Sequence, residues 1–81
     1  MESDPVFTVF VERRQHLLER LDSTRSEVDA WIEAHKSEEP SLAELANLEG
    51  LLSRRREFLA QIIEIDDNFV DHLLTRYSLR G

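Results

Sequence analysis

Two long stripes of apolar residues, separated by a short polar link, constrain the fold of this chain more than any other feature. The spacing alternates between three and four residues in both halves of the chain, which is typical of helices packed lengthwise at a shallow angle. The first stripe comprises Phe7, Phe10, Arg14, Leu17, Leu21, Thr24, Val28, Trp31 and His35, widened on one side by Val11, Leu18 and Ile32. The second comprises Leu45, Leu48, Leu52, Arg55, Leu59, Ile62, Asp66, Phe69 and Leu73.

The ends of both helices carry recognisable signals. Asp4 can cap the first helix, and Pro5 suits its first position because a missing N–H costs nothing there. Pro40 disfavours helix at the residue before it, and Ser41 with Glu44 forms a capping box for the second helix. A short link makes the helices antiparallel neighbours. The 81 residues therefore predict one all-α domain, an antiparallel coiled-coil-like helical hairpin with helices over about 5–36 and 41–80 and a link at 37–40.

Both stripes contain charged residues, Arg14 in the first and Arg55 and Asp66 in the second. Antiparallel pairing about the link brings Arg14 close to Asp66, and Arg55 close to Asp22 or Glu27. A lone charge in an apolar seam is costly, whereas a charge that meets its opposite offsets that cost and helps to fix the register. We therefore expect a seam ion pair between Arg14 and Asp66.

The second helix has more apolar surface than one neighbouring helix can cover. The residues expected outside the seam, and hence as a partner-binding surface, are Phe58, Ile63, Ile65, Val70, Leu74 and Tyr77. An exposed apolar patch marks an interface. Three arrangements could cover it: a homodimer, an amphipathic helix of a partner protein, or a break in the second helix near Asp66–Asn68 that folds the end back as a third helix. Gly50 is another position where that helix could bend.

Charge and composition narrow the classes of partner. The chain has 17 acidic and 10 basic residues, for a net charge of −7, and contains no cysteine. Nucleic-acid binding requires positive charge against phosphate, so we expect no nucleic-acid partner. No apolar run reaches the roughly 18 residues that span a bilayer, and the first residues do not resemble a signal peptide. We expect no membrane contact and a cytoplasmic location.

The sequence offers no catalytic constellation. His16, His35 and His72 are scattered, without the spacing of four residues that places two metal ligands on one helix face. Asp66, Asp67 and Asn68 lack the glycine and closing glutamate of an EF-hand loop. The Arg54–Arg56 run is typical of a solvated helix face. We therefore expect no enzymatic activity, cofactor, metal or small-molecule substrate.

The segments LEGLLSRRREFLAQIIEIDDNF and VDHLLTRYSLR resemble the flagellar export chaperones of the FliT kind, and ERRQHLLERLDSTRSEVDAW is similar to their first helix. In that family an aspartate following several aliphatic residues leads into a final amphipathic helix, which here corresponds to Phe69 to Arg80. The chain is shorter than the usual family member. The resemblance implies a small cytoplasmic chaperone of flagellar or type III secretion that masks a partner's amphipathic helix.

Other helical proteins are similar as well. The short hairpin subunits that hold type III secretion needle proteins resemble this chain, as does the helical N-terminal segment of some insect retrotransposon Gag polyproteins. The sequence thus predicts a protein–protein interaction module, with a self-assembling coiled-coil unit without a separate client as the alternative.

Overall fold

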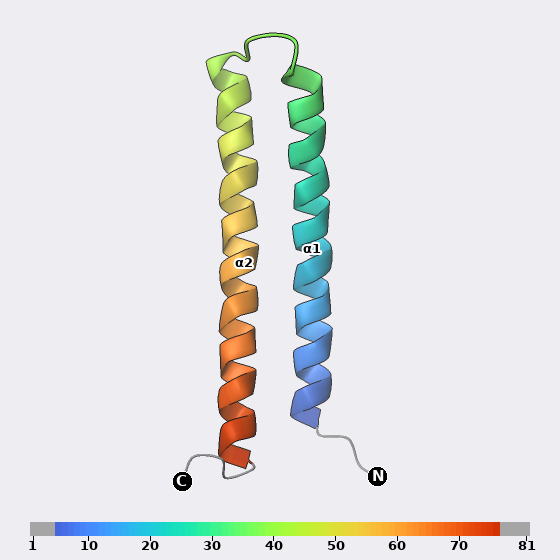
Figure 1. Ribbon diagram of the computed structural model, residues 1–81, viewed down its shortest axis with the longest axis vertical. Helices are drawn as coiled ribbons and strands as arrows, with labels where there is room; N and C mark the ends of the chain where they lie inside the picture. The colour runs from blue at the N-terminus through green and yellow to red at the C-terminus, as the bar shows by residue number, and fades with distance from the viewer. Residues whose placement is uncertain (1–4, 77–81) are drawn as a thin grey trace.

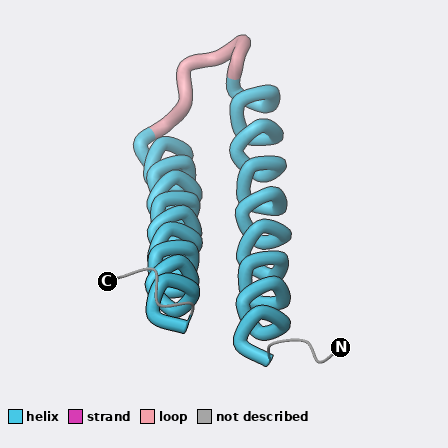
Figure 2. Tube along the Cα trace, turned by 60° about the horizontal axis from the view of Figure 1, so that its bottom comes forward, coloured by secondary structure: helices cyan, strands magenta, loops and turns pink. Residues whose placement is uncertain are grey.

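The computed structural model describes residues 5–76 and consists of two helices joined by a short link. α1 runs over Pro5–His35 and α2 over Leu42–Arg76. The helices lie side by side in opposite directions, and both views show a single layer with the link at one end (Figure 1, Figure 2). The prediction of an all-α antiparallel hairpin is therefore confirmed. Asp4 and Tyr77, to which the sequence assigns a cap and a contact, lie outside the described residues.

The start of α2 is fixed by the expected capping box. The backbone N–H of Glu44 donates to the Ser41 hydroxyl at 3.2 Å, and the backbone N–H of Ser41 donates to the Glu44 carboxylate at 2.9 Å. Two of the backbone donors that a helix start leaves unpaired are thereby satisfied. The chain after Pro40 therefore enters α2 in one defined direction, back along α1.

α2 continues without interruption past both positions where the sequence suggested a bend. Gly50 and the Asp66–Asn68 segment lie within one helix that extends to Arg76. Packing along α1 overrides the weak helix propensity of aspartate and asparagine. The alternative in which the end of the chain folds back as a third helix is therefore wrong for the described residues.

Contacts at the two ends of the hairpin define its register. At the open end, the Phe10 ring stacks on Phe69 with centroids 3.9 Å apart, and Phe7 meets the same ring edge-on at 5.5 Å. At the link end, the indole N–H of Trp31 donates to the backbone carbonyl of Glu44 at 3.0 Å. Aromatic pairs contribute beyond their buried area, so these contacts hold both ends of the two helices in one alignment.

The core between the helices is thin. Among the described apolar side chains only Leu17, Val28 and Ile62 are buried, at 6–8 % exposure. Thr24 is buried more deeply, at 2 %, and its hydroxyl donates to the backbone carbonyl of Arg20 at 3.0 Å. This bond satisfies the polar group within its own helix, so Thr24 fits the seam without a partner across it.

α2 is rotated relative to the prediction by less than one residue: Leu48, Ile62 and Phe69 keep their predicted places in the seam, but the row between them changes. Leu45 and Leu59, which the heptad pattern assigns to the seam, are 44 % and 42 % exposed. Phe58, which the pattern assigns to the outer flank, is half-buried and lines a hollow with Arg20 and Thr24 of α1. The small side chain of Thr24 leaves room for the phenyl ring, which explains why α2 turns Phe58 rather than Leu59 toward α1.

Gly50 offers a test of the open surface of α2. A Cβ placed there meets no atom within 4 Å. We expect Gly50→Ala to stabilise the fold by about 1 kcal/mol because alanine favours the helix, which raises Tm by roughly 4–8 °C for a chain of this size. Thermal unfolding followed by circular dichroism measures the shift. Ala46→Gly, at another exposed α2 position, should shift Tm downward by a similar amount; a lower Tm for Gly50→Ala would show that this side of α2 is covered.

Candidate interaction surface

The residues predicted to bind a partner divide into two groups in the structure. Ile63 and Val70 are 60 % and 53 % exposed, as expected of side chains that α1 does not reach. Phe58, Ile65 and Leu74 are half-buried. The predicted surface is therefore only partly a free surface.

Phe58 and Ile65 lie beside α1, which corrects the prediction that both belong to the outer flank of α2. Phe58 shares a hollow with Arg20 and Thr24, and Ile65 shares one with Arg13 and Leu17. The error follows from the rotation of α2, which moves both side chains from the outer flank to the edge of the seam. Neither is a free anchor for another chain.

One side of the hairpin forms a continuous shallow depression across both helices. Its walls near the open end include Val11 and Leu18 from α1 and Asp66 and Val70 from α2, with Phe10 and Phe69 between them. The flank of α1 that carries Val11 and the flank of α2 that carries Val70 therefore belong to the same side of the molecule.

Heptad spacing extends this side along the whole hairpin. Residues seven apart on a helix differ by only about 20° around its axis, so Leu18 and Ile32 follow Val11, Ile63 precedes Val70, and Leu59 and Leu45 precede Asp66. We call the resulting set the apolar face; its members are Val11, Leu18, Ile32, Leu45, Leu59, Ile63 and Val70. All except the half-buried Leu18 are 42–60 % exposed. Leu45 and Leu59 were missed because the sequence pattern assigned them to the seam.

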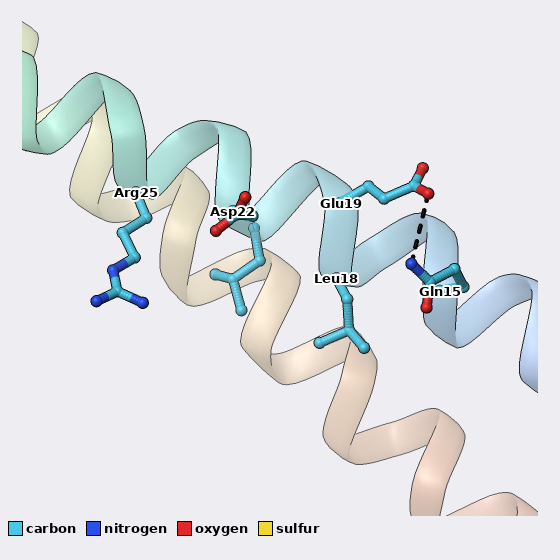
Figure 3. Close-up of a pocket in the computed structure, with 6 residues that line it drawn as sticks. Gln15, Leu18, Glu19, Asp22 and Arg25 are labelled. Atoms are coloured by element: carbon cyan, nitrogen blue, oxygen red, sulfur yellow. Dashed lines mark hydrogen bonds between the residues drawn. The ribbon is translucent and has the colours of Figure 1, made fainter.

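The middle of the apolar face carries charges of both signs. Leu18 and Arg25 extend from the same edge of α1, with Asp22 between them, whereas Glu19 extends away and accepts a hydrogen bond from Gln15 at 3.5 Å (Figure 3). Arg56 lies seven residues before Ile63, so it occupies the corresponding column of α2. By the same spacing Glu49 precedes Arg56 and Asp29 follows Asp22, so this face carries both acidic and basic side chains.

The predicted seam ion pair is present at the edge of the apolar face. The Arg14 guanidinium donates from Nε to Oδ1 of Asp66 at 2.9 Å. The two side chains are 40 % and 39 % exposed, so solvent screens the attraction. The pair therefore contributes more to alignment than to stability.

The opposite side of the hairpin is polar over most of its length. Its side chains, spaced by seven on each helix, are Arg13, Arg20 and Glu27 of α1 and Arg54, Gln61 and Asn68 of α2. Glu27 pairs with Arg54 at 3.6 Å, whereas the sequence offered Glu27 as a partner for Arg55, which is exposed. We call this set the polar face.

Four residues around the link form a compact cluster. His35 stacks on Trp31 with ring centroids 4.2 Å apart, and its Nδ1 lies 2.7 Å from the Trp31 carbonyl oxygen. Its Nε2 is hydrogen-bonded to the carboxylate of Glu44, which also accepts from the backbone N–H of Ser41. The cluster joins the last turn of α1 to the first turn of α2.

Both ionisable groups of this cluster are shifted toward their charged forms. The hydrogen bond to the Trp31 carbonyl, assisted by Glu44, raises the pKa of His35 above its usual value of 6.5. The backbone N–H of Ser41, assisted by the Ser41 hydroxyl and His35, lowers the pKa of Glu44 below 4.5. A charged imidazole donates from both nitrogens, so the cluster is complete only when His35 is protonated and Glu44 is ionised.

The described residues show no cluster suited to a metal ion. Within residues 5–76 no three His, Cys, Asp or Glu side chains gather closely enough to hold one. Neither α1 nor α2 is long and apolar enough to cross a membrane.

No protein-family model, curated protein or solved structure matches this chain.

The link cluster predicts a stability optimum in mildly acidic solution. Because the pKa of His35 is raised, the stability that its charged form contributes to the fold is complete below pH 6.5. This stability is lost as pH rises through the folded-state pKa. Because the pKa of Glu44 is lowered, the stability that its ionised form contributes is present above pH 4.5. This stability is lost as pH falls through the folded-state pKa. We expect Tm to be highest between these values. In His35→Gln the decline on the alkaline side should disappear, whereas His16→Gln on the polar side should retain it; an equal decline in both would exclude the cluster as its cause.

The Arg14–Asp66 pair can be measured by a double-mutant cycle. We expect Arg14→Ala, Asp66→Ala and the double variant to give a coupling energy of about 0.2–1 kcal/mol, because the pair is substantially exposed. Urea unfolding supplies the three free-energy differences. The same cycle on Glu27 and Arg54, whose distance is longer, should give a smaller value. A coupling near zero for Arg14 and Asp66 would show that the pair plays no part in holding the helices together.

Proposed function

We propose that this chain is a protein–protein interaction module that receives helices on its apolar face. The observation that carries the proposal is the column of exposed aliphatic side chains running along both helices on one side. An amphipathic helix presents anchors at intervals of three, four and seven residues, and a groove between two parallel rows of aliphatic residues is suited to receive them. The role is one of binding, and the absence of catalysis remains a prediction.

The surface chemistry supports binding to protein. Large exposed apolar patches on small proteins mark interaction sites. Here the patch follows two straight helices, so its shape suits an elongated partner rather than a compact small molecule. The charges within it are of both signs, so a partner can meet them with opposite charges.

The resemblance to flagellar export chaperones of the FliT kind supplies a prediction about the partner. In that case the apolar face masks an amphipathic helix of an export substrate in the cytoplasm until delivery. A structural role, in which the face joins copies of the chain into a coiled-coil unit, remains the alternative. Both uses require the same face to be covered in the cell.

Site-specific photocrosslinking tests the module itself. A photoreactive residue at position 63, where Ile63 is 60 % exposed on the apolar face, should form a discrete protein adduct in a lysate of the source cells. Position 9, where Val9 is 48 % exposed and lines a hollow with Arg13 and Ile65 on the other side, is the control. Mass spectrometry then identifies each adduct as a second copy or another protein. Equal yields from both positions, or no adduct from position 63, would contradict the proposed function.

A further inference from the structure

The hairpin is too thin to be a complete globular unit. Its radius of gyration is 18.4 Å, whereas a compact domain of this length has about 12 Å. It exposes 6532 Å², against about 5,000 Å² for a compact monomer of 9.5 kDa. The excess, roughly 1,500 Å², is larger than the ~800 Å² that each partner contributes to an interface of standard size. Domains ordinarily consist of at least two packed layers, and this chain supplies one.

We propose that a second copy of this chain covers the apolar face, so that two hairpins form a four-helix bundle with both links at the same end. The inference rests on the proposed function and names the partner. In this arrangement a two-fold axis runs along the bundle, and α1 of each copy lies against α2 of the other. The second copy provides a layer of the same length and the same apolar face, so each face is covered over its full extent.

The heights of the apolar residues, that is, their positions along the long axis of the hairpin, favour this arrangement. The register set by Arg14–Asp66 at one end and Trp31–Glu44 at the other places Val11 at the height of Val70. By the same register, Leu18 lies level with Ile63, whereas Ile32 lies level with Glu49 and about one turn from Leu45. A two-fold axis along the bundle preserves height, so Val11 and Leu18 of one copy meet Val70 and Ile63 of the other.

The charges of the apolar face lie near the middle of the hairpin. By the register that places Val11 level with Val70, Arg56 lies level with Arg25 and about one turn from Asp22. With the links at the same end, Asp22 therefore lies between Arg25 of its own copy and Arg56 of the second copy, so the carboxylate has guanidinium groups on both sides. The mixed charges also allow a chain of net charge −7 to associate with itself.

Matched valine variants test the interface on the full chain. Sedimentation equilibrium across a dilution series should give a mass twice the 9.5 kDa of one chain. Val70→Glu places a carboxylate on the apolar face of each copy and should weaken dimerisation about 100-fold or more. Val9→Glu makes the same change at a similarly exposed valine on the other side and should leave the dimer intact. Circular dichroism accompanies both variants, because loss of the dimer can reduce helix content.

A distance measurement tests the orientation in a chain with its apolar face unaltered. The sequence contains no cysteine, so Lys36→Cys at the link accepts a single spin label. Links at the same end place the two labels within about 30 Å, whereas links at opposite ends separate them by about 45 Å, the length of α1. Double electron–electron resonance spectroscopy on the labelled dimer measures this distance. The shorter distance supports the proposal, and the longer one overturns it.

The remaining outcomes separate this inference from the proposed function. A monomeric mass at all concentrations overturns the dimer; if position 63 then crosslinks a different protein, the interaction module still stands. A monomer that gives no adduct from position 63 overturns both. A dimer that Val9→Glu dissociates and Val70→Glu does not overturns the assignment of the interface to the apolar face.

Discussion

The connection between the two helices is the constraint on which the rest of the structure depends. Ser41 and Glu44 fix the direction in which α2 leaves the link, and Trp31 and His35 fasten the end of α1 to the same turn. Because both helices are long and nearly straight, an alignment set at this end is carried to the other. The stacking of Phe10 on Phe69 and the Arg14–Asp66 pair are formed at the open end in the same alignment. A shift of one residue in either helix would separate both.

That alignment determines the functional surface as well as the seam. Val11 and Leu18 of α1 fall at the heights of Val70 and Ile63 of α2, so two separate columns become one face. The thin core has the same origin. Two helices can enclose only the narrow line between them, which here contains Leu17, Thr24, Val28 and Ile62. Most of the apolar side chains of such a chain must therefore be exposed or be covered by another molecule.

The parts of this structure that depend on local sequence could be predicted, and those that depend on a choice between equivalent rows could not. The capping box follows from residue types three apart, and the Arg14–Asp66 pair follows from two charges in opposite heptad rows. The rotation of α2 does not follow in this way, because Phe58 and Leu59 are both apolar and either could face α1. The choice depends on the space beside Thr24 on the other helix. The contact of His35 with Glu44 depends on the conformation of the link, which no periodic pattern specifies.

The difference between the two faces bears on how large an assembly can become. The polar face carries arginine, glutamate, glutamine and asparagine side chains over most of its length, and these retain their water more readily than they pack against a third layer. A molecule with an apolar interaction surface on both sides could stack without limit, as sheets and filaments do. A molecule with one apolar side and one hydrated side forms a closed complex once its apolar side is covered. The placement of the arginines on this hairpin therefore favours a finite complex over a growing polymer.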